Sequence, residues 1–125
     1  YSLVKAAMTI RDMGPKYLII KKGEHGALLF HEDNIFFAPA LPLEEVFDPT
    51  GAGDTFAGGF MGYLSATDDI SFDNMKRAII AGSALASYTV EKFGTQKLME
   101  INSSMLEERM NEFVKLSEFS APVLV

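Results

Sequence analysis

The sequence predicts an α/β fold in which a short β-sheet with a hairpin is flanked by helices. Two observations support this prediction. Apolar residues recur at helical spacing near the start of the chain and through its second half, and three short runs rich in strand-forming residues lie between them, separated by turn sequences. The 125 residues, 48% of them hydrophobic, are enough for one soluble domain with its own core.

The first helix is expected at residues 2–13. Four apolar side chains would share one face of it, namely Leu3, Ala7, Ile10 and Met13. Gly14 and Pro15 follow directly, and this pair is typical of the position just past a helix end.

Three strands should follow as consecutive neighbours in one sheet. Tyr17 to Lys22 and Gly26 to His31 are apolar runs separated by the turn sequence Gly-Glu-His-Gly, which predicts a hairpin. Asp33 and Asn34 form a second turn, and it leads into a third strand at Ile35 to Ala38.

The second half of the chain has a helical pattern. One helix is expected from Asp54 to about Ala66, although it contains Gly58, Gly59 and Gly62. Each glycine should cost roughly 0.5–1 kcal/mol relative to alanine, so helix propensity does not explain their presence.

Two more helices are predicted after it. Ser71 is a plausible N-cap for a long helix with a buried stripe, formed by Phe72, Met75, Ile79, Gly82, Ala86, Thr89 and Phe93. Gly94 would end that helix. Ser104 and Glu107 have the spacing of a capping box at the start of a last helix, which should turn inward Leu106, Met110, Phe113 and Val114.

The overall composition argues against several classes of partner. A net charge of −6 without a lysine- or arginine-rich run argues against nucleic acid and against an anionic membrane surface. The absence of cysteine excludes disulfides and thiolate metal sites and fits a reducing cytosol, so we expect a cytoplasmic protein. No apolar run approaches the roughly 18 residues of a membrane span. The first residues have no initiator methionine and no signal-peptide pattern, so we interpret the chain as a fragment.

The segment that carries chemistry is 48–54, Asp-Pro-Thr-Gly-Ala-Gly-Asp, directly before a predicted helix. Unpaired amides and the positive end of the helix dipole meet at such a place and attract phosphate. Gly51 and Gly53 lack a Cβ, so the amides of Gly51, Ala52, Gly53 and Asp54 could converge on one anion. A carboxylate would repel that anion. Asp54 is better explained as a base that takes a proton from an incoming hydroxyl.

The loop does not match two other phosphate-binding motifs. There is no P-loop motif, and Gly51-x-Gly53 is followed by Phe56 where a dinucleotide-binding fingerprint has glycine. Taken alone, a Gly-x-Gly-Asp turn is most often a tight loop with a helix cap. Lys21 and Lys22 are ordinarily exposed charge at a strand end, and only the context of the motif favours a phosphate contact for them.

A longer string carries a family resemblance. Residues 48–61, DPTGAGDTFAGGFM, resemble the second signature of the ribokinase-type (PfkB family) sugar and nucleoside kinases. Residues 21–26, KKGEHG, are similar to the turn against which ATP lies in that family. The likeness covers about residues 1–118 and leaves 119–125 as a tail. It implies the C-terminal, ATP-binding and catalytic part of a ribokinase-like three-layer sandwich.

The resemblance also implies roles for individual residues. It makes Asp54 the catalytic base and Gly51, Ala52 and Gly53 the anion hole. The residues implied at the nucleotide are Lys21, Gly23, Gly26 and, on the adenine side, Ser83. Some family members need a monovalent cation such as K⁺. By this resemblance, the ligands of the cation would be Asp48, Thr50, Thr89, Lys92 and Gly94.

The implied reaction is transfer of the γ-phosphoryl group from ATP, with Mg²⁺, to a hydroxyl of a small-molecule sugar or nucleoside. The family's N-x-x-E element, which helps to order magnesium, is absent, and so is its substrate-binding N-terminal half. We therefore expect the missing half as a partner, and nucleotide binding without turnover by the chain alone. The resemblance does not decide whether the acceptor is adenosine-like, fructose-like or ribose-like. It also leaves open whether the protein forms a homodimer. The alternative is a non-catalytic nucleotide-binding or structural fragment.

Overall fold

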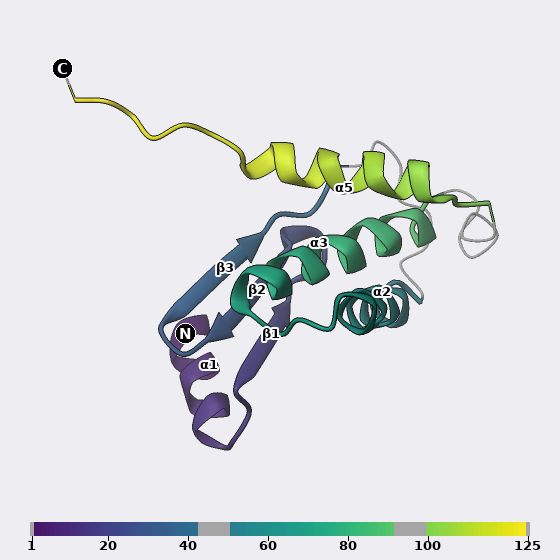
Figure 1. Cartoon of the computed structure of the whole chain (residues 1–125). Helices are drawn as coiled ribbons and strands as arrows, with labels where there is room; N and C mark the ends of the chain where they lie inside the picture. The colour runs from purple at the N-terminus through teal and green to yellow at the C-terminus, as the bar shows by residue number, and fades with distance from the viewer. Residues whose placement is uncertain (1, 43–50, 92–99, 125) are drawn as a thin grey trace.

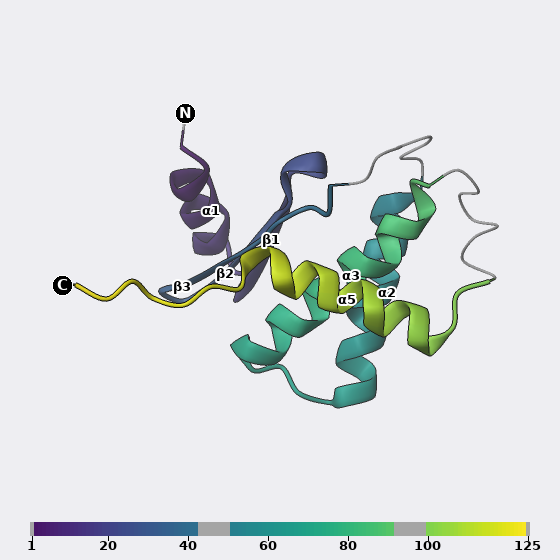
Figure 2. The same ribbon diagram turned by 90° about the horizontal axis from the view of Figure 1, so that it is seen from above.

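The computed structural model describes residues 2–42, 51–91 and 100–124. A short sheet separates one helix from a group of the others (Figure 1). The elements are α1 (Leu3–Asp12), β1 (Tyr17–Lys21), the 3₁₀ helix η1 (Gly23–His25), β2 (Ala27–His31), β3 (Asn34–Ala38), α2 (Ala52–Thr67), α3 (Phe72–Thr89) and α5 (Ser103–Ser117). Figure 2 shows α1 on one face of the sheet and α2 and α3 on the other, with α5 lying across α3. The predicted α/β class, a small sheet flanked by helices, is confirmed.

The sheet has the predicted topology. Its strands lie in the order β1-β2-β3 and both pairs are antiparallel, with Ile19 opposite Leu29 and Leu29 opposite Phe36. Residues opposite one another point to the same face. This row therefore faces the core, where Leu29 is fully buried.

Gly26 closes the turn between β1 and β2. Its φ of 88° and ψ of −154° are a combination open essentially to glycine. A Cβ there would also stand 2.2 Å from the carbonyl oxygen of Ala38, so the end of β3 passes directly over this residue. Gly26 is thus required by both conformation and space.

The first helix begins and ends as the sequence predicts. The Ser2 side chain accepts a hydrogen bond from the Lys5 amide at 3.3 Å, and Gly14 leaves the helix with a φ of 131°. The expected apolar face is only partly covered within the described residues. Ala7 is buried, whereas Ile10 and Met13 are exposed.

The second helix begins earlier than expected, at Ala52 instead of Asp54. Its N-cap is Gly51, which has the left-handed φ of 83° that a side chain would disfavour. The prediction that Asp54 opens the helix is therefore wrong, because Asp54 lies within its first turn. Glycine-rich sequence suggested a loop where the backbone is already helical.

The glycines of α2 have different explanations. A Cβ on Gly59 would stand 2.9 Å from the Cα of Gly82, and a Cβ on Gly82 would stand 2.7 Å from the carbonyl oxygen of Phe56. The two helices therefore touch backbone to backbone at this point, which explains Gly59. Gly58 and Gly62 are exposed and have nothing within 4 Å of such a Cβ among the described residues.

A buried asparagine closes the connection between α2 and α3. The side-chain amide of Asn74 donates to the Thr67 hydroxyl at 2.8 Å and to the Asp69 carbonyl at 2.7 Å. Ser71 is the N-cap of α3, as predicted, and accepts from the Asn74 amide at 3.3 Å. The Ser71 amide donates to the Asp69 carboxylate and lowers the pKa of that carboxyl. These bonds hold the two helices as an antiparallel pair.

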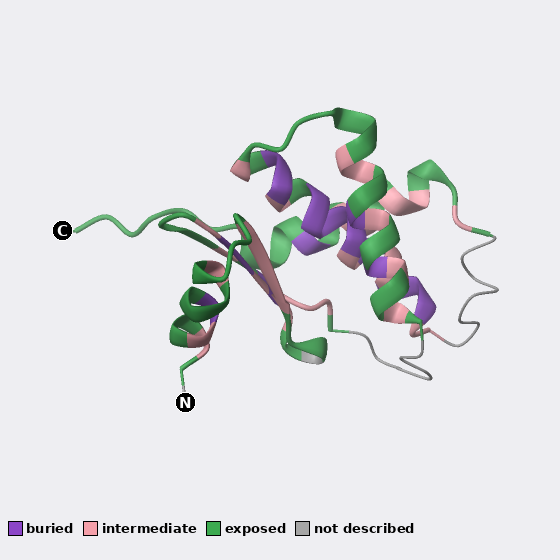
Figure 3. Ribbon diagram, turned by 90° about the horizontal axis from the view of Figure 1, so that it is seen from below, coloured by how far each residue is buried: buried purple, intermediate pink, exposed green. Residues whose placement is uncertain are grey.

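The long helix α3 supplies half of the core cluster (Figure 3). Most of the predicted stripe is buried, with Phe72 and Ala86 half-buried, while Phe93 and Gly94 lie outside the described residues. The core cluster consists of Leu29, Ala38, Phe56, Phe60, Met75, Ala78, Ile79, Ile80, Ala84 and Phe113.

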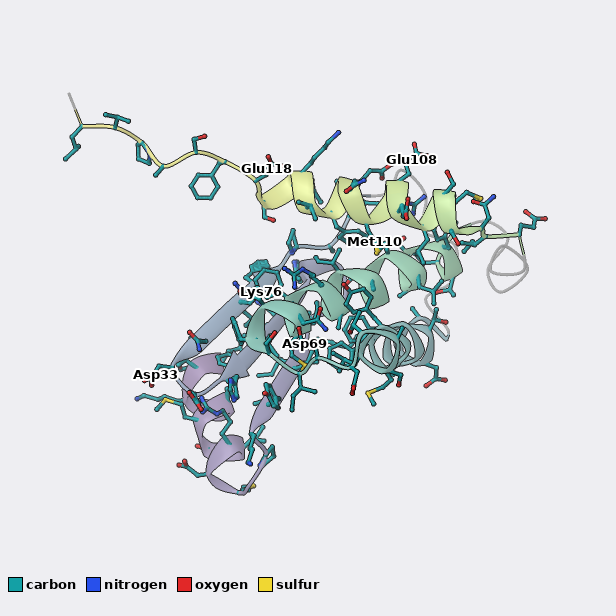
Figure 4. The ribbon with its side chains drawn as sticks, viewed as in Figure 1. Asp33, Asp69, Lys76, Glu108, Met110 and Glu118 are labelled. Atoms are coloured by element: carbon teal, nitrogen blue, oxygen red, sulfur yellow. The ribbon has the colours of Figure 1, made fainter. Side chains whose placement is uncertain are left out.

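The last helix is capped differently from the prediction. Asn102 is its N-cap and accepts from the Met105 amide at 2.9 Å, so the Ser104–Glu107 capping box is wrong. The predicted face is right for Leu106, Met110 and Phe113, but Val114 is exposed. Figure 4 shows Met110 on the side of α5 toward α3 and Glu108 on the opposite side.

Residues 119–124 are exposed and have no regular structure. Among the described residues, no helix combines the length and the apolar character of a membrane span.

The contact between α2 and α3 makes a prediction for stability. Gly82→Ala should lower the free energy of unfolding by about 1–3 kcal/mol, because the new methyl group would meet backbone and force the helices apart. Gly62→Ala is the matched control. It fills open space in the same helix pair and should raise stability by about 0.5–1 kcal/mol. Urea unfolding of the full-length protein measures both, and equal effects would contradict the close crossing.

Candidate active site

The start of α2 presents several amide groups without an intrahelical acceptor. The first bond of the helical pattern runs from the Thr55 amide to the Gly51 carbonyl at 3.0 Å. The amides of Ala52, Gly53 and Asp54 precede this bond and are left free by the geometry of the helix. The positive end of the helix dipole lies at the same place, so this turn is suited to an anion.

The chain around these amides is held in shape locally. The hydroxyl of Thr55 donates to the Gly51 carbonyl at 3.0 Å, which reinforces the backbone bond to the same oxygen. Gly51 has open space around its missing side chain, so its glycine is explained by the left-handed backbone alone. The predicted anion cradle is therefore a defined first turn of a helix.

The structure places Lys21 beside this turn. Lys21 ends β1, and its Nζ lies 3.3 Å from the point where a Cβ on Gly53 would stand. The same Nζ lies 4.8 Å from the centre of the Phe56 ring, which projects from the next turn of α2. An ammonium group above an aromatic face is attracted to it. Lys21 is therefore directed toward the cradle by a contact that the sequence did not reveal.

This arrangement brings two sources of positive charge together. A cation is disfavoured at the N-terminal end of a helix, where the dipole is already positive. Lys21 nevertheless lies there, in a chain whose net charge is −6. An anion between the ammonium and the amides would be attracted by both. This electrostatic argument supports a phosphate site more strongly than the glycines alone do.

Asp54 lies in the same first turn, with its residue exposed to solvent. A carboxylate in the first turn of a helix is favoured by the dipole, so Asp54 has a structural role as well as the predicted catalytic one. Its exposure leaves it accessible to a second molecule that approaches the cradle. Asp54 and the free amides thus share one turn.

The predicted nucleotide residues fall in two places. Gly23 and Gly26 form the turn after Lys21, with φ values of 55° and 88°, and the Lys22 amide donates to the Gly26 carbonyl at 2.7 Å. They lie at the same end of β1 as Lys21. Ser83 is half-buried in the middle of α3. None of the contacts in the structure brings Ser83 to the described part of the cradle.

Most of the predicted cation ligands lie in segments that the structure does not describe. Asp48, Thr50, Lys92 and Gly94 lie outside the described residues. Thr89 is buried, and its hydroxyl donates to the Ala86 carbonyl at 2.6 Å within its own helix. Among residues 2–42, 51–91 and 100–124, no three histidine, aspartate or glutamate side chains gather closely enough to hold a metal. The described residues therefore do not form a protein-held magnesium site.

Two residues at or near the site were missed by the sequence analysis. Phe56 was used only to exclude a dinucleotide motif, yet it holds the Lys21 ammonium. Arg109 of α5 pairs with Glu91 just past the end of α3, with 2.8 Å between Nη1 and Oε1. An aromatic residue within the glycine-rich motif was an available signal for Phe56. Nothing local in the sequence indicates the partner of Arg109.

Comparison with known proteins gives a consistent result. A family model described as pfkB family carbohydrate kinase matches residues 2–102. A nucleoside kinase from Methanothermobacter thermautotrophicus is 39% identical over 88 residues, which are 70% of this chain and 26% of the relative. The chain therefore spans only about a quarter of the length of that relative.

Solved structures share the fold. Aminoimidazole riboside kinase from Salmonella enterica, complexed with aminoimidazole riboside and an ATP analog, matches with a TM-score of 0.72 and 31% identity over 86% of this chain and 35% of its own. A double mutant of fructokinase from Vibrio cholerae, bound to fructose, ADP and potassium ion, matches with a TM-score of 0.76 at 21% identity, over 88% of this chain and 35% of its own. The expected ribokinase-like fold is confirmed.

The position of Lys21 makes a prediction for anion binding. Lys21→Met should weaken binding of pyrophosphate by about ten- to a hundredfold, because a charge-assisted hydrogen bond contributes roughly 1.5–3 kcal/mol. Lys22→Met removes the same charge from the neighbouring, exposed residue and should change the affinity far less. Isothermal titration calorimetry on the full-length protein measures both. Equal losses would indicate only a general effect of charge.

Proposed function

Because the chain belongs to the pfkB family of carbohydrate kinases, we propose that it is the catalytic part of an enzyme that transfers the γ-phosphoryl group of ATP to a hydroxyl of a sugar or nucleoside. The observation that carries this proposal is the first turn of α2, which combines free amides and the nearby Lys21 with the Asp54 carboxylate. Such a turn can bind the transferred group and also accept a proton from the group that attacks it.

The anion-binding part of the site lowers the barrier by compensating charge. The amides of Ala52 and Gly53 donate to oxygens of the transferring phosphoryl group, where negative charge is spread in the transition state. Lys21 adds a full positive charge from the end of β1. Because these groups belong to a helix and a strand, little reorganisation is needed during the reaction.

Asp54 acts on the acceptor. Its carboxylate takes the proton of the acceptor hydroxyl while the hydroxyl oxygen forms a bond to the γ-phosphorus. The bond between that phosphorus and the oxygen that bridges it to the β-phosphorus breaks, and its electron pair leaves with ADP. The products are ADP, the phosphorylated acceptor and a protonated Asp54 that returns its proton to solvent.

The remaining ligands complete the proposal. The turn from Gly23 to Gly26 would line the nucleotide together with Ser83. K⁺ would be held near Asp48, Thr50, Thr89, Lys92 and Gly94. Magnesium would be held with the ATP phosphates by groups outside the described residues, since these form no metal cluster. The relatives named for a nucleoside, for aminoimidazole riboside and for fructose support a sugar or nucleoside acceptor as a class.

A second candidate follows from the length of the chain. It spans 26% to 35% of the relatives compared with it, and the family resemblance implies that the acceptor is bound mostly outside this span. On its own the chain would be a nucleotide-binding or structural fragment that binds ATP weakly without turnover. The missing part would complete the three-layer sandwich. Phosphoryl transfer by the 125 residues alone would refute this candidate.

The role of Asp54 is tested by Asp54→Asn in the full-length protein. The variant keeps a polar side chain of the same shape but removes the base, so kcat should fall by at least about 10²-fold while KM for ATP stays within a few-fold. The matched control is Asp73→Asn, which removes the carboxylate from the first turn of α3, away from the site. The control should retain wild-type kcat. A near-normal kcat for Asp54→Asn would leave that residue with only its role at the helix dipole.

The cation proposal has its own test. Potassium should raise the activity of the full-length protein above that in sodium, and Asp48→Ala should remove the difference, because Asp48 begins the implied cation-binding element. Steady-state rates in matched KCl and NaCl measure it. Equal rates of the wild type in both salts would exclude Asp48 from this role.

A further inference from the structure

Arg109 of α5 contacts three groups at the end of α3 and one on its own helix. Its Nη1 lies 2.8 Å from the Glu91 carboxylate and donates to the Ser87 hydroxyl at 2.8 Å. Its guanidinium carbon lies 4.1 Å from the centre of the Tyr88 ring, and its Nε lies 3.7 Å from the Glu112 carboxylate. We call Arg109, Ser87, Tyr88 and Glu91 the Arg109 cluster.

The cluster is partly shielded from water, and a further hydrogen bond connects it to α5. The side chain of Arg109 is 15% exposed and that of Glu91 28%. The Tyr88 hydroxyl donates to the Met105 carbonyl at 3.0 Å, and burial raises the pKa of the Tyr88 phenol, so it remains a neutral donor. The end of α3 and the first turns of α5 are therefore fixed to each other by polar contacts of defined direction.

The same end of α3 lies next to the phosphate site. The two helices run antiparallel, and Gly82 of α3 contacts Gly59 and Phe56 of α2. Continuing along the pair, the first turn of α2 meets the last turns of α3. Figures 1 and 2 both show the beginning of α2 beside the end of α3. A shift of the end of α3 would therefore change the surroundings of the first turn of α2.

We propose that Arg109 is a positioning residue for the nucleotide, because it holds the end of α3 in place beside the cradle. This inference rests on the function proposed above. Arg109 does not touch the cradle and acts through Ser87, Tyr88 and Glu91. The planar guanidinium suits the task, since it stacks on a ring and forms directional bonds at the same time.

The chemistry of the cluster favours positioning over simple stabilisation. Exchange of a shielded ion pair for apolar side chains is often neutral for stability, because the desolvation of the charges offsets their attraction. An apolar contact between α3 and α5 would serve stability alone. The directional bonds instead define one orientation of the last turn of α3.

The test is Arg109→Met in the full-length protein, with Arg77→Met as the matched control on the exposed side of α3. We expect KM for ATP to rise about tenfold in the first variant, because nucleotide binding must then order the end of α3, while kcat and KM for the acceptor stay within about twofold. Arg109→Lys should recover part of the affinity. The control should behave as the wild type.

A milder variant keeps the proposal testable if Arg109→Met does not fold. Glu91→Gln removes one bond of the cluster and should also raise KM for ATP, and the double variant Arg109→Met/Glu91→Gln should be no worse than Arg109→Met alone. The proposal is overturned if folded variants bind ATP as the wild type does, or if kcat and both KM values decline together with the melting temperature. The ADP affinity of the same variants, measured by calorimetry, separates a positioning role of Arg109 from a general effect on stability. A wild type that binds ADP but transfers no phosphoryl group refutes the proposed function and leaves Arg109 testable.

Discussion

The site depends on the close approach of α2 and α3 at Gly59 and Gly82, where the two backbones touch. A side chain at either position would separate the helices. With the helices in contact, Phe56 packs into the core and presents its ring to Lys21, and the first turn of α2 lies beside the end of α3. Gly59 and Gly82, which weaken their helices on their own, therefore help to place the free amides of this turn.

Electrostatics explains why this place would hold a phosphate group. The positive end of a helix and a lysine ammonium are brought together, although each disfavours the other, in a chain of net charge −6. The Phe56 ring stabilises the ammonium only in part. A bound anion would be attracted by both, and Asp54 in the same turn would then be close to the group that attacks that anion.

The parts of the structure that depend on local chemistry could be predicted from the sequence. The three strands, the Ser71 cap and the Gly14 stop follow from neighbouring residues alone. The predicted start of α2 was too late because the glycines at 51 and 53 are typical of a loop, whereas only Gly51 has a non-helical, left-handed backbone. The cap of α5 was misplaced because Asn102 and Ser104 are chemically equivalent candidates. The contacts of Lys21 with Phe56 and of Arg109 with Glu91 depend on packing between distant segments, which no local pattern encodes.

The proposed function requires that the first turn of α2 binds the phosphates of the nucleotide. A crystal structure of the full-length protein with a non-hydrolysable ATP analogue, which keeps the γ-phosphate, is the direct test. We expect phosphate oxygens within about 2.7–3.2 Å of the amides of Ala52 and Gly53 or of the Lys21 ammonium. Phosphates bound at another part of the chain, with this turn in contact only with solvent, would contradict it.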